Sequence, residues 1–465
     1  MDIHVTVLPP EEHVLPNGTA VFEVTIPELD VRQYLYLPFD EFHRFFNAPE
    51  GIEADLLVVA GIVYLVDQLV PRSSFPDNWT RGLALSIPVE NPQIWGNVSE
   101  SLADAFQFLT GDRWQFIFNG RQVPIYHYRK RRLRAKPLRP ASTTCLFSGG
   151  LDSLVGAIDL LEEQDSPITL VSHYDLGSTA KRAQANLANR LRREYPWRIN
   201  LIQARVGGVS HVHSSQDVFG RVQKPQTKES TFRSRSIVFL ALGLYVARQH
   251  SIETHVPLLV PENGFVALNP PLTDARIGSC STKTTHPTFL DKFQSIVEQL
   301  GIPNEIRNPF VNKSKGEVLA QALNENLVQE LAPRSISCAH PTRRQGWYRK
   351  HGVMHCGYCV PCLIRRASLY QVGLDEGTDY GFDVWAGELG LSEDVAVDLR
   401  AILSWVYSAI YNGSSAQSIV KKMDLPISDQ AAAQHVIQSG LDEMMQIISD
   451  KAEDRIKQWA GLETL

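Results

Sequence analysis

The strongest constraint on the fold is an alternation of strand-like and helix-like segments between residues 143 and 260. Four short apolar runs have the length of buried strands, at 143–147, 168–172, 199–204 and 255–260. Three helical segments separate them, at 154–161, 179–194 and 234–249. Strands that alternate with helices form a parallel sheet covered by helices on both faces. The sequence therefore predicts an α/β domain, with further helices at 289–300 and 314–330.

A glycine-rich turn joins the first strand to its helix, with the sequence Ser148-Gly149-Gly150-Leu151-Asp152-Ser153. Adjacent glycines let backbone N–H groups turn toward an anion, and the positive end of the helix dipole points to the same place. Ser148 and Ser153 add hydroxyl donors. The turn lacks the ending of a Walker A loop and the GxGxxG pattern. It predicts a phosphate site, the alternative being a plain turn capped by serine and aspartate.

Four of the six cysteines cluster within 25 residues, at Cys338, Cys356, Cys359 and Cys362. Four thiolates at this spacing match a tetrahedral structural zinc site, and a closed shell leaves no position for catalysis. Free thiols or an iron–sulfur cluster are the alternatives. His340, His351 and His355 lie close enough to replace one cysteine. Cys145 is expected in the core as a small apolar residue, and Cys280 has no proposed role.

The turn in its strand–helix context resembles the PP-loop of the ATP pyrophosphatase superfamily, whose members cleave ATP to AMP and pyrophosphate. The resemblance implies that residues 148–153 hold ATP, that Asp152 helps to place Mg²⁺, and that AMP is transferred to an oxygen of the substrate. It also implies an adenosine contact at His173, for which an ordinary residue at a strand end is the alternative. Ser148, Asp152 and Ser153 are the expected catalytic residues of the loop.

The PP-loop together with the later Cys…CxxCxxC resembles the 7-cyano-7-deazaguanine synthase family (QueC) over about residues 143–370. Arg235 lies where that family has an Arg-Asn pair, with Ser236 replacing the Asn, and Lys315 lies in a Ser-Lys-x-Glu helix start. The resemblance implies that Arg235 and Lys315 are catalytic. It implies an ATP-dependent ligase that forms a C–N bond on the carboxylate of 7-carboxy-7-deazaguanine, which ammonia converts to an amide and then to a nitrile.

The substrate side of the site is expected after the strand at 255–260, because parallel sheets bind ligands at the carboxyl ends of their strands. Glu262 and Asn263 offer acceptor and donor groups to a guanine-like edge, and a Pro–Asn–Gly turn is the alternative. Lys283 is a further candidate for a substrate or phosphate charge. For Lys283, as for Lys315 and Arg235, a surface ion pair is the alternative.

The rest of the chain divides into three regions. Residues 1–126 are predicted to form a β-rich accessory domain, with one possible helix at 54–70. Residues 127–142 form a basic linker, in which positions 127–140 hold seven Lys or Arg and no acid; a groove for a polyanion is the alternative. The α/β domain with its zinc segment at 338–362 then spans 143–370. Residues 371–465 are predicted to be helical.

Composition excludes several classes of protein. Hydrophobic residues make up 43% and charged residues 21% of the 465 positions, as in globular proteins. The longest apolar run, 56–66, is 11 residues and too short to span a bilayer. No secretory signal is visible, so a cytoplasmic protein with no membrane contact is expected. The net charge of −6 disfavours a bulk nucleic-acid binder, although local basic patches leave nucleic acid open.

About 140 residues precede the PP-loop and about 95 follow the zinc segment, more than an ordinary synthase carries. These additions, Ser236 and the Pro261-Glu-Asn-Gly264 segment resemble the QueC-like proteins of bacterial anti-phage operons, most closely the QatC type of the Qat system. That resemblance implies that an amine of a partner protein from the same operon attacks the activated carboxylate. The alternatives are a stand-alone synthase that uses ammonia, a tRNA-modifying PP-loop enzyme, and a nucleotide-binding module without turnover.

Overall fold

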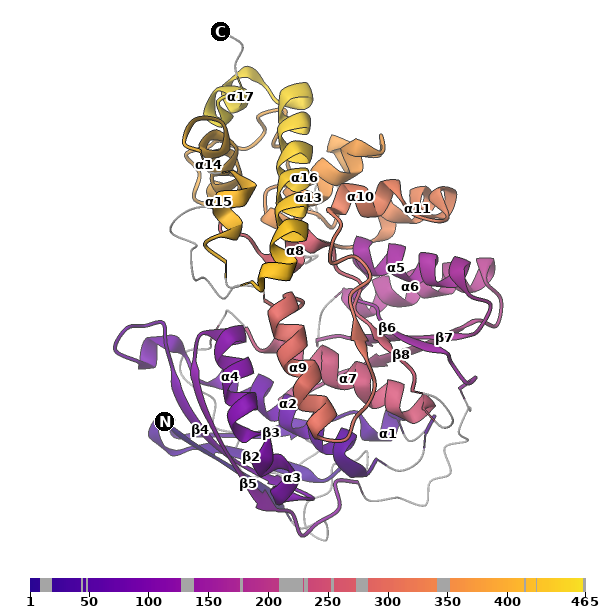
Figure 1. Ribbon diagram of the computed structural model, residues 1–465, viewed down its shortest axis with the longest axis vertical. Helices are drawn as coiled ribbons and strands as arrows, with labels where there is room; N and C mark the ends of the chain where they lie inside the picture. The colour runs from indigo at the N-terminus through magenta and orange to yellow at the C-terminus, as the bar shows by residue number, and fades with distance from the viewer. Residues whose placement is uncertain are drawn as a thin grey trace.

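The computed structural model places the N-terminal strands, the α/β region and the C-terminal helices in three adjoining parts (Figure 1). It describes residues 1–8, 19–42, 45–46, 49–126, 138–175, 179–208, 229, 233–251, 255–272, 283–340, 352–413, 415–423 and 425–462. Most of the basic run (127–137), Cys280 and His351 lie outside these residues. No helix among them is long and apolar enough to cross a bilayer.

The N-terminal sheet has six strands in the order β5-β4-β1-β2-β3-β9. Their bounds are β1 Asp2–Leu8, β2 Val21–Ile26, β3 Val31–Tyr36, β4 Gly82–Val89, β5 Arg113–Gly120 and β9 Gly207–Gly208. The β1–β4 and β4–β5 pairs are parallel and the others antiparallel. Helices of this part are α1 Phe39–Phe42, α2 Gly51–Leu69, α3 Pro92–Asn97 and α4 Ser99–Thr110. The predicted helix at 54–70 is therefore confirmed as α2.

The second sheet is parallel throughout, in the order β11-β10-β6-β7-β8. Its strands are β6 Thr143–Leu146, β7 Ile168–His173, β8 Ile199–Ala204, β10 Leu258–Leu259 and β11 Ile306–Arg307. Its helices are α5 Leu151–Glu163, α6 Ala180–Glu194, α7 Arg235–His250 and α9 Pro287–Gln299. All six residues of β7 are buried, as expected for a strand covered on both faces. The predicted α/β class with a parallel sheet is confirmed.

The prediction of a single helix at 314–330 is wrong. The chain forms two helices there, α10 Lys315–Ala320 and α11 Glu325–Leu331. Asn324 explains the break, because its side chain accepts from the backbone N–H of Leu327 at 3.1 Å and so caps a new helix. The predicted strand at 255–260 also proves shorter, since only the two residues of β10 pair with neighbours.

The N-terminal sheet is not packed as a separate accessory unit. Its edge strand β9 comes from residues 207–208, after the first three strands of the second sheet. Helices α2 and α7 pack against each other, and one hydrophobic core contains residues of the N-terminal strands, α7 and α9. The N-terminal part therefore helps to fix α7, whose first residue is Arg235.

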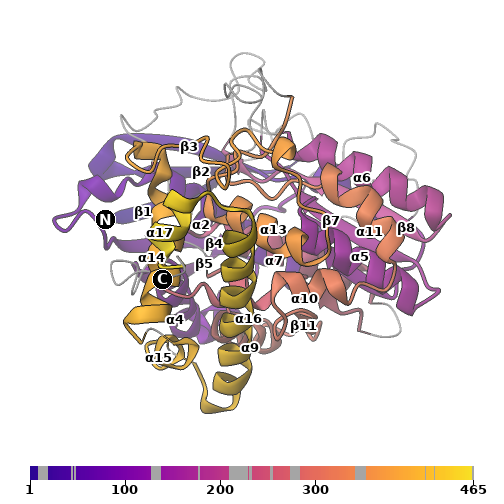
Figure 2. The ribbon, with the colours of Figure 1, turned by 90° about the horizontal axis from the view of Figure 1, so that it is seen from above.

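The C-terminal helices surround a second core that also contains the four clustered cysteines. The helices are α8 Gly264–Leu268, α13 Val360–Gln371, α14 Val397–Tyr411, α15 Ala416–Val420, α16 Ile427–Lys451 and α17 Asp454–Ala460. Short 3₁₀ turns lie at Pro27–Leu29, Arg72–Ser74, Ala332–Arg334, Gly377–Asp379 and Asp394–Ala396. Seen from above, α14 to α17 stand over the N-terminal sheet, with α5 and α6 to one side (Figure 2).

Candidate active site and metal cluster

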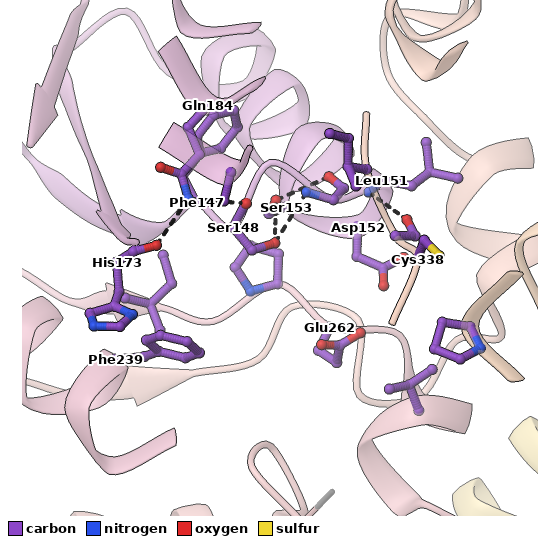
Figure 3. Close-up of a pocket in the computed structure, with 18 of the residues that line it drawn as sticks. Phe147, Ser148, Leu151, Asp152, Ser153, His173, Gln184, Phe239, Glu262 and Cys338 are labelled. Atoms are coloured by element: carbon purple, nitrogen blue, oxygen red, sulfur yellow. Dashed lines mark hydrogen bonds between the residues drawn. The ribbon is translucent and has the colours of Figure 1, made fainter. Parts of the chain in front are cut away.

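A cavity of about 390 Å³ opens at the carboxyl edge of the parallel sheet (Figure 3). Nine of the residues predicted for the site line it: Ser148, Gly150, Leu151, Asp152, Ser153, His173, Arg235, Glu262 and Lys315. They come from the turn before α5, the end of β7, the start of α7, the segment after β10 and the start of α10. The edge of a parallel sheet is where α/β folds place ligands.

The glycine-rich turn owes its shape to Gly149, whose φ of +83° is strained for any other residue. A Cβ at this position would also lie 3.2 Å from Cγ of Gln184. The Gln184 amide donates to the carbonyls of Ser148 at 3.2 Å and His173 at 3.1 Å, and so ties the turn to the end of β7. The Ile336 N–H donates to the Gly149 carbonyl at 2.8 Å from the opposite side.

The hydroxyls of Ser148 and Ser153 lie 3.1 Å apart inside the turn. Ser148 Oγ accepts from the Gly150 N–H at 3.2 Å, and Ser153 Oγ donates to the Gly150 carbonyl at 3.0 Å. Helix α5 begins at this point with no side-chain cap. The turn therefore presents two hydroxyls and the positive end of a helix to one space, an arrangement that suits phosphate oxygens.

Asp152 is the centre of a buried charge cluster. Its Oδ2 accepts from the Lys315 ammonium at 2.7 Å and from the Asn263 amide at 3.0 Å. Burial raises the pKa of Asp152, but the Lys315 charge and the hydrogen bonds outweigh burial and hold that pKa below its usual value. Burial and the neighbouring Asp152 charge together raise the pKa of Glu262 well above its usual value.

His173 is buried beside Phe239, with ring centres 5.3 Å apart. Its Nε2 lies 3.3 Å from the Val206 carbonyl, so Nε2 carries the proton and donates. Burial lowers the pKa of His173 to about 4, which keeps the ring neutral at pH 7. Nδ1 is buried and has no hydrogen-bond partner among the described residues.

Arg235 reaches the cavity from the first turn of α7. Its guanidinium forms an ion pair with Asp175 at 2.9 Å and lies 5.3 Å from the centre of the Phe239 ring. The helix start is fixed by Asp67 of α2, whose Oδ2 accepts from the Ser234 N–H at 2.8 Å and the Ser234 hydroxyl at 2.7 Å. Asp67 is fully buried and forms an ion pair with Arg81. The N-terminal part thus positions one wall of the cavity.

The four cysteines predicted to bind a metal lie close together and could hold an ion. The Sγ atoms of Cys338 and Cys359 lie 4.0 Å apart, and those of Cys356 and Cys362 lie 3.8 Å apart. His340 adds a fifth potential ligand, because its ring and the thiols of Cys338, Cys356 and Cys359 all lie within 4.8 Å of one another. Hydrogen bonds from Cys356 and the other thiols hold the pKa of Cys338 below its usual value. Buried thiolates and an imidazole are the donors that zinc prefers.

The cysteine cluster is connected directly to the glycine-rich turn. Cys338 itself lines the cavity, and Ser337 accepts from the Leu151 N–H at 3.4 Å through Oγ. Arg365 of α13 donates to Ser335 at 2.8 Å, so this segment is held from the other side as well. The cysteine cluster and these hydrogen bonds therefore hold residues 335–338 against the glycine-rich turn.

Two substrate-binding predictions are not supported by the geometry. Lys283 is not among the residues that line the cavity, and its ammonium lies 4.3 Å from the centre of the Phe108 ring of α4. The Asn263 side chain is occupied by Asp152 and by the Val266 N–H, whose bond to Asn263 Oδ1 caps α8 at 3.1 Å. The Asn263 side chain therefore holds Asp152 and the start of α8.

Sequence reasoning missed Gln184, Ser337 and Asp67, whose hydrogen bonds hold the glycine-rich turn and the start of α7. Each lies in a helix or loop without a local motif, and only its spatial neighbours reveal its role. Cys145, by contrast, lies in the core as expected, and burial raises the pKa of its thiol to about 12.

Comparisons with known proteins give two distant relatives. No family model matches the chain, and no solved structure does. A 7-cyano-7-deazaguanine synthase of Methanococcus aeolicus is 30% identical over 96 residues, which are 20% of this chain and 38% of that protein. A second one, of Rhizobium meliloti, is 24% identical over 258 residues, 53% of this chain and 96% of that protein. The chain thus spans under two fifths of the first relative and nearly all of the second. These similarities support a QueC-like relationship.

Proposed function

We propose that the chain is a QueC-like PP-loop enzyme that uses ATP to activate the carboxylate of a 7-deazaguanine such as 7-carboxy-7-deazaguanine. The observation that carries the proposal is the cavity in which the glycine-rich turn meets the Asp152–Lys315 pair. The turn offers phosphate donors, and the pair offers a cation and a carboxylate within one enclosed volume. The names of the two distant relatives supply the substrate class.

In the proposed reaction, a carboxylate oxygen of the base attacks the α-phosphorus of ATP and pyrophosphate leaves. The turn and the hydroxyls of Ser148 and Ser153 hold the departing pyrophosphate. Lys315 and Arg235 offset the negative charge that collects on the phosphate oxygens during transfer. The adenosine would lie beside His173 and the Phe239 ring, which both line the cavity.

Two carboxyl groups, Asp152 and Glu262, fit a hard cation such as Mg²⁺ by the chemistry of their oxygen donors. When bound, Mg²⁺ neutralises phosphate charge. Four of the five donors Cys338, His340, Cys356, Cys359 and Cys362 would hold a zinc ion, which would stabilise the fold. The bound ion would help to keep residues 335–338 against the turn.

An amine then attacks the acyl carbon of the adenylate, the C–N bond forms as the bond to AMP breaks, and AMP and a proton are released. In the QatC-type reading, the amine belongs to a partner protein of the same anti-phage operon, and the product is an amide between the base and that protein in the cytoplasm. The support comes from the additional N-terminal and C-terminal residues of this chain. The N-terminal sheet and the C-terminal helices add surface around the cavity that a synthase of ordinary length lacks.

A stand-alone synthase is the second candidate. The observation in its favour is that the match covers 96% of the Rhizobium meliloti synthase. In this reading ammonia replaces the protein amine, and a second adenylation removes the amide oxygen to give the nitrile. No observation on the described residues favours the tRNA-modifying or binding-only alternatives.

The proposal is tested by incubating the purified chain with Mg²⁺, ATP and 7-carboxy-7-deazaguanine, and by measuring pyrophosphate. We expect release that depends on the base and is lost in Asp152→Ala. Addition of the operon partner should increase the partner's mass by that of the acyl base, as read by mass spectrometry. Nitrile formation from ammonia with no change in the partner's mass would refute conjugation and leave the synthase. No pyrophosphate with any carboxylated deazaguanine would refute both.

A further inference from the structure

The C-terminal helix α16 carries a polar stripe that faces the catalytic region. His435, Ser439 and Glu443 follow at four-residue spacing and so share one face of the helix. Figure 1 shows α16 beside α13 and α8, and α16 also contacts α10. The stripe meets the N-terminus of α10, the helix that begins with Lys315.

Two members of the stripe contact Glu317 in the first turn of α10. His435 Nε2 lies 2.9 Å from Glu317 Oε1, and the Ser439 hydroxyl lies 3.3 Å from the same oxygen. Glu317 in turn accepts from the Ser314 N–H at 2.7 Å, while Ser314 Oγ accepts from the Glu317 N–H at 3.1 Å. This capping box defines where α10 begins, and α16 supports it from outside.

Glu443 contacts the two residues that flank Lys315. Its Oε1 accepts from the Gly316 N–H at 3.1 Å and from the Ser314 hydroxyl, and its Oε2 accepts from the Ser368 hydroxyl of α13 at 3.2 Å. The carboxyl group is buried, with 8% of the residue exposed. A buried carboxyl with three donors links α16, α10 and α13 at one point.

Gly316 makes room for this carboxyl. A Cβ at position 316 would lie 2.4 Å from Glu443 Oε1, closer than real Cβ contacts allow. The backbone at Gly316 does not require a positive φ, so space is the constraint there. Glycine in a first helical turn costs helix stability relative to alanine. The absence of a side chain at Gly316 therefore allows the Glu443 carboxyl group to reach the start of α10.

We propose that Glu443 is a positioning residue, which fixes Ser314 and Gly316 on either side of Lys315 and thereby holds the Lys315 ammonium on Asp152. The C-terminal helical region thus becomes part of the machinery of the site. The activity measured below rests on the proposed function, whereas the placement of Lys315 does not. A second measurement therefore reads that placement directly.

Four variants separate positioning from general stability. Glu443→Ala removes all three acceptor contacts, and Glu443→Gln keeps one carbonyl acceptor for α10. Gly316→Ala drives the carboxyl away by steric conflict. Asp442→Asn, on the exposed neighbouring position, is the matched control for a change of charge on α16. Pyrophosphate release gives kcat and KM for ATP, and quantitative lysine labelling by mass spectrometry gives the accessibility of Lys315 relative to exposed Lys421.

We expect Glu443→Ala and Gly316→Ala to lower kcat by about tenfold or more, because displacement of a catalytic group by an ångström has effects of this order. Both should raise Lys315 labelling severalfold. Glu443→Gln should stay within about threefold of the wild type, since the acceptor survives. Adding Gly316→Ala to Glu443→Ala should cause little further loss, because the clash no longer exists.

Unchanged Lys315 labelling and kcat in a folded Glu443→Ala protein would overturn the inference. So would a loss in Glu443→Gln as large as in Glu443→Ala, because it would show that the charge and not the hydrogen bonding matters. Raised labelling in Glu443→Ala, in a chain whose wild type releases no pyrophosphate, would support the positioning role and refute the proposed function separately.

Discussion

Replacement of Lys315 by methionine tests the buried charge cluster. Methionine has about the length of the lysine stem but no charge, so packing is largely kept. The Lys315 and Asp152 side chains are 6% and 8% exposed, and their charged atoms lie 2.7 Å apart. The variant therefore leaves Asp152 buried beside the Asn263 amide and Glu262, without the Lys315 ammonium.

The size of the effect follows from the distance and the burial. Two unit charges at this separation attract by about 6 kcal/mol at an effective dielectric constant of about 20. Desolvation of the ammonium in the wild type offsets part of this energy. Removing one partner of a buried pair costs about 3–5 kcal/mol in measured cases. We expect Lys315→Met to lose about this much unfolding free energy at pH 7.5, and pyrophosphate release with it.

The loss should depend on pH in a defined direction. In the wild type, the pKa of Asp152 is lowered by Lys315, so the stabilisation is complete above the ordinary pKa of aspartate and is lost as the pH falls through the lower folded value. In the variant, burial is no longer opposed by the ammonium and the pKa of Asp152 rises. The difference in unfolding free energy between the wild type and Lys315→Met is therefore greatest at neutral pH and becomes smaller toward about pH 4.

Urea denaturation followed by tryptophan fluorescence at pH 7.5 and pH 5 measures the difference. The control is Lys313→Met, whose ammonium lies over the Phe310 ring and forms no ion pair among the described residues. Asp152→Asn and the double variant complete a mutant cycle, and the double variant should lose less than the sum of the single losses. A loss of unfolding free energy below about 1 kcal/mol at pH 7.5, with no coupling between Lys315 and Asp152 in the cycle, would refute the reasoning. Solvent-exposed ion pairs have energies of that size.

Two further outcomes follow from the site. The purified chain should hold about one zinc ion. Removal of that ion by a strong chelator should lower both the unfolding temperature and pyrophosphate release, because residues 335–338 would no longer be held against the glycine-rich turn. Full activity of the metal-free protein would contradict this link. Gly149→Ala should cost about 1–2 kcal/mol from the left-handed backbone alone and abolish pyrophosphate release, whereas Gly301→Ala, at φ +81° with open space around it, should cost stability but keep activity. Equal activity in both glycine variants would show that the shape of the turn is not required.

Local pattern was enough to predict much of the α/β region. The apolar residues of β6, β7 and β8 indicated buried strands, although each strand also contains polar residues such as Thr144, Thr169 and Asn200. The Ser148–Ser153 turn was visible because its glycines are needed for local backbone geometry. The prediction of one helix at 314–330 was wrong because the Asn324 side chain caps a new helix at that point. The helical spacing of apolar residues around Asn324 does not reveal this break.

The sequence by itself determined the parallel sheet, the glycine-rich turn and the group of cysteines, since each depends on neighbours within a few residues along the chain. Only the tertiary structure decided which distant groups meet. Asp152 and Lys315 are separated by 163 positions and Ser314 and Glu443 by 129, so no local pattern connects them. Their pairing follows from burial, because a carboxyl group enclosed by the fold must find donors there. The same requirement accounts for the hydrogen bond from the Asn263 amide to Asp152 and for the contact of Glu443 in α16 with the start of α10.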